Sequence, residues 1–66
     1  MFKLNQFSHG DQLVLNTARS VGYRVALVVT GADGLHAALA VGHNAAALRD
    51  PGQHYAVVPL EEVEGL

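Results

Sequence analysis

The first third of the chain has the hydrophobic spacing of an amphipathic helix. Apolar residues recur every three to four positions, the period of an α-helix, at Leu13, Val14, Ala18 and Val21. Ser8 precedes them as a candidate N-cap with Asp11 in the first turn, and Gly22 follows as a residue that easily takes the left-handed conformation at a helix end. The pattern predicts a helix over residues 9–21 that packs inward through these four apolar positions.

The middle of the chain has the pattern of a β-hairpin. Residues 23–30 are rich in β-branched side chains, residues 35–41 form a second short apolar run, and residues 31–34 between them contain the Asp-Gly pair typical of hairpin turns. A loop of two and a loop of four residues are both open, and either choice leaves the faces of the side chains unchanged. One expected face holds Ala26, Val28, Leu35, Ala37, Leu39 and Val41, and the other holds Tyr23, Val25, Leu27, Val29, His36, Ala38 and Ala40.

Both expected faces of this hairpin are apolar. Antiparallel sheets with one face in water normally alternate polar and apolar residues, so the hairpin needs a cover on each side. The sequence offers one clear helix for this purpose. The second face is left for the C-terminal third, for another copy of the chain or for a partner protein.

Residues 45–50 are ambiguous between a strand and a short helix capped by Asn44. We favour the strand, because Pro51 disfavours helical backbone at the residue before it and so short a helix is marginal alone. Pro51 and Gly52 then predict a turn.

The end of the chain predicts one more strand and an acidic tail. Residues 54–58 read as the strand, which Pro59 ends, and residues 60–66 either begin a helical turn or fray. The expected class is therefore α+β. One N-terminal helix is followed by a small antiparallel sheet of three to four strands, in a single domain over residues 1–66.

Composition limits what this domain can be. The chain has 66 residues, half of them apolar, and no cysteine, so its core must come from aliphatic packing or from assembly rather than from disulfides. The lack of cysteine and of a signal-peptide pattern predicts a cytoplasmic protein. Residues 25–29, the longest apolar run, fall far short of the roughly 20 residues of a membrane-spanning helix, so we expect no membrane partner.

Charge is unevenly distributed along the sequence. Residues 1–49 contain all the basic residues, namely Lys3, Arg19, Arg24 and Arg49, whereas residues 50–66 contain only acidic ones, namely Asp50, Glu61, Glu62 and Glu64. Scattered basic residues do not form a nucleic-acid footprint, so we expect no direct binding of DNA or RNA. The acidic end is either a solvated tail or a surface that occupies a basic groove of another protein.

The histidines raise the possibility of a metal site. They are His9, His36, His43 and His54, with Asp50 as a further candidate ligand. No two of them have the i, i+4 spacing that would place a ligand pair on one helix face, and no cysteine could complete a zinc site. We therefore expect neither a metal nor a cofactor.

The order of Ser8, His36 and Asp50 along the chain resembles that of the papain-like cysteine peptidase fold. In that fold the nucleophile opens a helix, a histidine lies on a later strand, and an Asp or Asn follows. Here the nucleophile position holds Ser8, which an N-cap explains more simply, and no cysteine is present. The resemblance implies an inactive relative, and we expect the protein not to be an enzyme.

In size, acidic character and lack of a catalytic motif, the chain resembles small phage-encoded anti-CRISPR proteins. These proteins share no common motif, so the resemblance is attached only to Asp50, Glu61, Glu62 and Glu64. It implies a viral inhibitor in the host-cell cytoplasm that binds a CRISPR effector complex and blocks DNA recognition through an acidic, DNA-mimicking surface. The alternative is a homo-oligomeric adaptor or structural protein, such as a homodimer, that self-associates through the second hairpin face.

Overall fold

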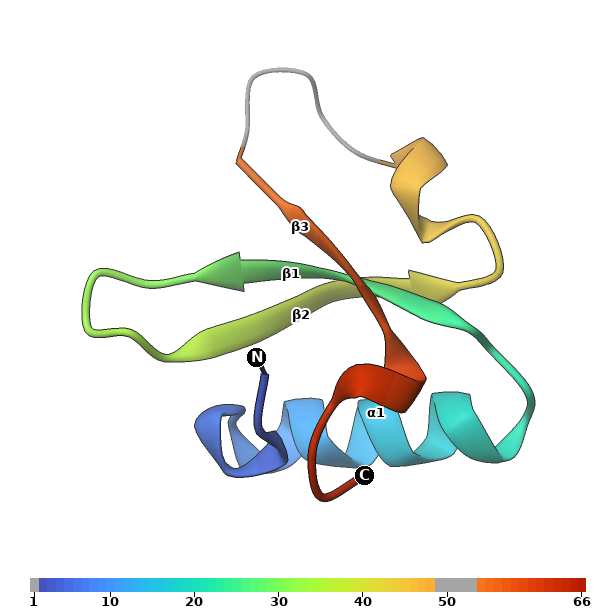
Figure 1. Ribbon diagram of the computed structural model, residues 1–66, viewed down its shortest axis with the longest axis horizontal. Coiled ribbons are helices and arrows are strands. Elements are labelled where there is room, and N and C mark those ends of the chain that lie inside the picture. The colour runs from blue at the N-terminus through green and yellow to red at the C-terminus, as the bar shows by residue number, and fades with distance from the viewer. Residues whose placement is uncertain (1, 49–53) are drawn as a thin grey trace.

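A computed structural model describes residues 2–48 and 54–66, and its helix lies against one face of a small sheet (Figure 1). The α-helix is α1 (His9–Ser20), and the strands are β1 (Val25–Thr30), β2 (His36–Gly42) and β3 (Ala56–Pro59). The described residues also form three one-turn 3₁₀ helices, η1 (Leu4–Gln6), η2 (Ala45–Leu48) and η3 (Leu60–Glu62). The sheet is antiparallel with the order β2-β1-β3. This arrangement confirms the α+β class.

The ends of α1 follow the capping signals of the sequence. The Ser8 hydroxyl accepts a hydrogen bond from the Asp11 backbone N–H at 3.2 Å, which satisfies one of the free donors of the first turn. Gly22 has a φ of 92°, and the Tyr23 N–H next to it donates to the Ala18 carbonyl at 2.9 Å. The predicted helix is confirmed, with its last residue at Ser20.

The buried face of α1 agrees with the predicted one at Ala18 but not at the other three positions. Leu15 and Ala18 are buried, with 0% and 2% of their surfaces exposed, whereas Leu13 and Val21 are 69% and 63% exposed. Helical periodicity allows two apolar stripes on this helix, and it cannot tell which one faces the sheet. The buried stripe contains Leu15 and the small Ala18 side chain.

A single core lies between α1 and one face of the sheet. Its buried side chains come from nearly every part of the chain, namely Phe7, Leu15, Ala18, Ala26, Val28, Val58, Leu60 and Val63. Partly buried side chains of both terminal segments, including Phe2, Leu4 and Leu66, pack against this cluster. The two ends of the chain therefore close the core that one helix alone cannot cover.

A β-bulge in β2 changes the predicted hairpin faces. Leu27 pairs with Ala40 and Val28 pairs with Ala38, so Leu39 is an extra residue between the two pairs. An extra residue reverses the alternation of side chains on one side of the bulge.

The predicted faces of the β2 side chains are therefore wrong before Leu39 and correct after it. Ala38 pairs with Val28, and His36 pairs with Thr30. Ala38 and His36 therefore belong to the face that α1 covers. Val41, after the bulge, pairs with Ala26 on that same face, as predicted. The error arises because a two-residue period cannot reveal an inserted residue.

The second face of the sheet is partly covered by η2. Leu27 and Ala45 are each 1% exposed and lie outside the main core cluster, and η2 contacts both β1 and β2. The expectation of a strand over residues 45–50 is wrong for the described residues 45–48, because a turn from Asn44 to Ala47 closes a 3₁₀ helix there. The predicted turn at Pro51 and Gly52 lies outside the described residues.

The C-terminal strand and tail continue the core. The predicted strand is present, shifted to Ala56–Pro59, and β3 pairs along β1. The tail then forms the helical turn η3, with Pro59 as its N-cap. Of the two alternatives open for the tail, a helical turn is therefore the one observed.

The two leucines of α1 give a matched test of the buried stripe. Leu15→Ala should lower the free energy of unfolding by about 2–5 kcal/mol, because it leaves a cavity in the core. Leu13→Ala should change it by about 0.5 kcal/mol or less at low protein concentration, because Leu13 is exposed. Urea unfolding followed by circular dichroism measures both values, and equal losses would show that the helix is rotated differently.

Candidate functional site

The predicted acidic residues lie on the C-terminal segment. Glu61 and Glu62 belong to η3, Glu64 follows two residues later, and all three side chains are exposed. Asp50, the fourth predicted member of this site, lies outside the described residues. The structure thus places three of the four acids close together along one short segment.

This segment is anchored to the domain at both ends. The Leu60 N–H donates to the Arg24 carbonyl at 2.8 Å, the Glu64 N–H donates to the Phe2 carbonyl at 2.9 Å, and the Leu4 N–H donates to the Glu64 carbonyl at 2.9 Å. Leu60 and Val63 are 2% and 4% exposed, so the apolar residues of the tail point inward while the acids point outward. The acidic side chains therefore stand on an ordered frame.

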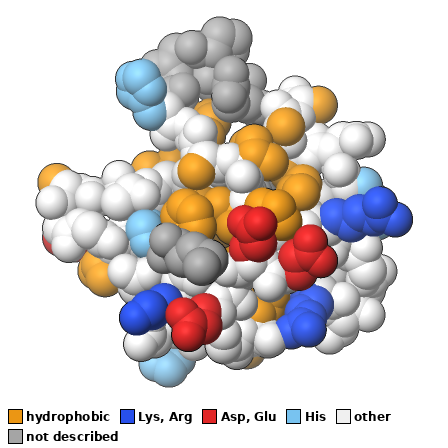
Figure 2. Space-filling view, in the orientation of Figure 1, with side chains coloured by type: hydrophobic (Ala, Val, Ile, Leu, Met, Phe, Trp, Pro, Cys, Tyr) orange, Lys and Arg blue, Asp and Glu red, His pale blue; other side chains and the backbone are white. Residues whose placement is uncertain are grey.

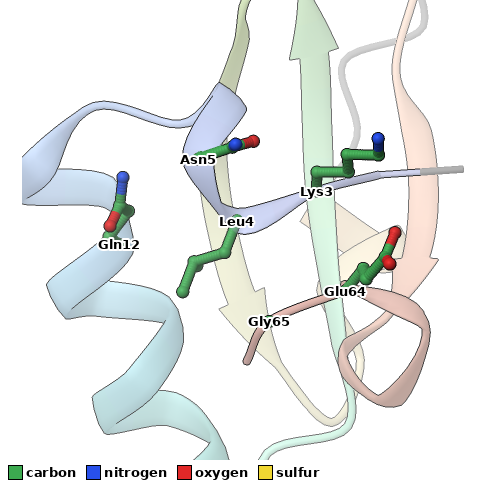
Figure 3. Close-up of a pocket in the computed structure, with 6 residues that line it drawn as sticks. All are labelled: Lys3, Leu4, Asn5, Gln12, Glu64 and Gly65. Atoms are coloured by element: carbon green, nitrogen blue, oxygen red, sulfur yellow. The ribbon is translucent and has the colours of Figure 1, made fainter.

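The fold brings basic residues beside the acidic ones. The backbones of Lys3 and Glu64 pair in an isolated parallel β-bridge. The two residues also line one hollow of about 390 Å³, where they lie opposite Gln12 of α1 (Figure 3). Arg19, Arg24 and Glu61 line a second hollow of about 390 Å³. Figure 2 shows acidic and basic side chains interspersed on this face.

Residues 50–66 contain only acidic charges along the sequence, as stated above. In space, however, the N-terminal segment and the end of α1 pack against the tail and bring basic residues next to it. Arg19 provides a further link, since its guanidinium donates to the Leu66 carbonyl oxygen. The surface around the three glutamates has mixed charge.

An apolar groove lies between α1 and β2. It has a volume of about 300 Å³, and every residue that lines it is uncharged, namely Leu13, Val14, Thr17, Ala18, Val21, Tyr23 and Val41. At one end the Tyr23 ring packs edge-on against the His43 ring, with centroids 5.4 Å apart. The sequence pattern had identified the helical part of this stripe, but as core rather than as surface.

The histidines occupy separate environments. The His36 ring lies between the rings of Phe2 and Phe7, with centroids 4.8 and 5.6 Å away, and its Nδ1 is hydrogen-bonded to the Thr30 hydroxyl at 3.0 Å. Within residues 2–48 and 54–66, no three His, Asp or Glu side chains are grouped closely enough to hold a metal ion.

Ser8 and His36 have structural roles in the described part of the chain. The Ser8 hydroxyl caps α1, and the His36 ring packs between two phenylalanines. Phe7, next to Ser8, forms an isolated backbone β-bridge with His36, so Ser8 and His36 lie on neighbouring segments. Among the hydrogen bonds of the described residues, none joins the side chains of Ser8 and His36. Asp50, the third member of the papain-like order, lies outside the described residues.

No protein family, curated protein or solved structure matches this chain. Among the residues that the structure describes, none of the helices has both the length and the apolar surface needed to cross a membrane.

Replacement of Ser8 tests whether its hydroxyl group stabilises the protein by capping α1. Ser8→Ala should lower the free energy of unfolding by about 1 kcal/mol, because the Asp11 N–H loses its acceptor. Ser8→Asp should retain the stability, since Asp is an equally good N-cap. Thermal unfolding of the three proteins measures the effect, and a loss of equal size in both variants would contradict the capping role.

Proposed function

We propose that the protein is a non-enzymatic protein-binding inhibitor that uses Glu61, Glu62 and Glu64 to occupy a basic surface of its partner. The observation that carries this proposal is the anchoring of the tail, which holds three exposed acids on an ordered segment. Charges on an ordered frame lose little freedom on binding, and they both accelerate and orient the encounter with an oppositely charged surface.

The neighbouring basic residues define the partner more narrowly. Lys3 lies beside Glu64, and Arg19 and Arg24 share a hollow with Glu61. A groove that is uniformly basic would repel these cations. The mixed pattern therefore favours a basic groove that also presents acidic side chains opposite these cations, because repulsion against wrong partners is a source of specificity.

A CRISPR effector complex is the partner class that we propose for this surface. Such a complex holds nucleic acid in a positively charged channel. An inhibitor with exposed glutamates would compete with DNA for part of that channel, in the manner of the small anti-CRISPR proteins that the chain resembles.

A second candidate function is self-association as a homo-oligomeric adaptor or structural protein. A different observation favours it, namely the uncharged groove between α1 and β2. The second face of the hairpin, where the sequence places self-association, is partly covered by η2.

Neutralising the three glutamates tests the inhibitor proposal. The variant Glu61→Gln, Glu62→Gln, Glu64→Gln should bind the partner at least about tenfold more weakly, a loss of about 1.4 kcal/mol or more. The control Glu61→Asp, Glu62→Asp, Glu64→Asp keeps the charge and should retain most of the binding. Tagged forms of all three proteins are used to capture partners from a bacterial lysate, and the affinity of each captured protein is then measured at low and high salt.

Two outcomes would contradict parts of this proposal. Equal binding by the Gln variant, or binding that is insensitive to salt, would show that the glutamates are not the contact, since exposed charge pairs are screened by ions. The partner class is tested with a purified CRISPR effector and its target DNA in a gel-shift assay. If the wild-type protein leaves DNA binding unchanged, that partner class is wrong.

A further inference from the structure

The groove between α1 and β2 contains large apolar side chains that the fold leaves in water. Leu13, Val14 and Val21 of α1 are 69%, 45% and 63% exposed, and Tyr23 at the end of the groove is 40% exposed. Contiguous apolar surface of this kind on a small protein marks an interaction site more often than isolated exposed residues do.

The total surface of the chain also exceeds that of a typical compact monomer. Its accessible surface is 4412 Å² for a mass of 7.0 kDa. Folded monomers of that mass expose about 4,000 Å². The exposed apolar side chains of α1 contribute to this surface.

We infer that a second copy of this chain occupies the groove, with the two α1 helices packed antiparallel across a twofold axis. This inference deepens the self-association candidate and does not depend on the acidic surface. In a twofold dimer, each copy contributes the same patch to the contact. Because the lining of this groove is uncharged, the two copies bring no charges into the contact that would need partners of opposite sign. Antiparallel helices also bring opposite ends of their dipoles together.

The two edges of the sheet support contact on the β2 side. The β3 edge is only four residues long and contains Pro59, which cannot donate to a further strand. The β2 edge is longer and contains no proline, lysine or carboxylate side chain.

Two features limit strand pairing along the β2 edge itself. Phe7 bridges His36 at its start, and Leu39 forms the bulge in its middle. Leu39 is 54% exposed and Val41 lines the groove, so apolar side chains remain at this edge. The contact between copies is therefore made by side chains of α1 and β2 rather than by a continuous sheet.

The available area is sufficient for a reversible dimer. The side chains that line the groove together expose roughly 500 Å² in each copy, so a dimer that covered them completely would bury on the order of 1,000 Å², the lower bound for a specific interface. An interface of this size predicts association that depends on concentration, not an obligate dimer.

Sedimentation equilibrium of the full chain over a wide concentration range tests this inference. The mass of the wild type should rise from 7.0 kDa toward twice that value and stop there, because a twofold contact closes on itself. The variant Leu13→Glu, Val21→Glu should dissociate at least tenfold more readily, because charges enter the contact from both copies. The control Leu48→Glu changes a residue in η2 that is equally exposed, at 70%, and it should dimerise as the wild type does.

Circular dichroism checks that each variant is folded, and the milder Leu13→Gln, Val21→Thr variant replaces the double Glu variant if that one is not. A wild type that stays at 7.0 kDa at all concentrations would overturn the inference. Association of the groove variant equal to that of Leu48→Glu, or growth beyond a dimer, would overturn it as well. The inhibitor proposal has a separate readout, since the triple Gln variant should dimerise normally while losing its partner.

Discussion

The close packing of α1 on the sheet through Leu15 and Ala18 is the contact on which the rest of the structure depends. Both residues are almost fully buried, and they share one core cluster with Ala26 and Val28 of β1. A chain of 66 residues has few large side chains with which to fill a core. In addition, one helix alone does not cover the three-stranded sheet. The terminal segments must therefore complete the core, through Phe7 at one end and Leu60 and Val63 at the other.

This constraint explains both candidate surfaces. Because Leu60 and Val63 are buried in the core, the glutamates between and after them are held at the surface on a hydrogen-bonded segment. Because Leu15 and Ala18 face the sheet, the other apolar stripe of α1 is turned outward beside β2. The surfaces that the protein offers are thus by-products of how its small core is closed.

Local signals in the sequence predicted the local structure well. Ser8 and Gly22 marked the ends of α1, and the Asp-Gly turn joined two strands, because each of these signals depends only on nearby backbone. The rotation of α1 was not predictable in the same way, since two stripes satisfy the helical period and only the packing with the sheet selects one. The bulge at Leu39 and the approach of Lys3 to Glu64 are likewise set by tertiary contacts. For the candidate site, the sequence predicted the exposed acids but not the cations around them.

The two surfaces adjoin at one residue, which links the two proposals physically. Tyr23 lines the apolar groove and also the hollow that contains Arg19, Arg24 and Glu61. In the proposed dimer, packing against Tyr23 from the groove side would order its ring and hence one wall of that hollow. The proposed dimer would also present two C-terminal surfaces on one particle. Two weak contacts in one particle can give an avidity well above that of either contact, provided that the partner can engage both at once. Self-association of this kind would therefore strengthen the proposed partner binding without adding any new contact to the partner.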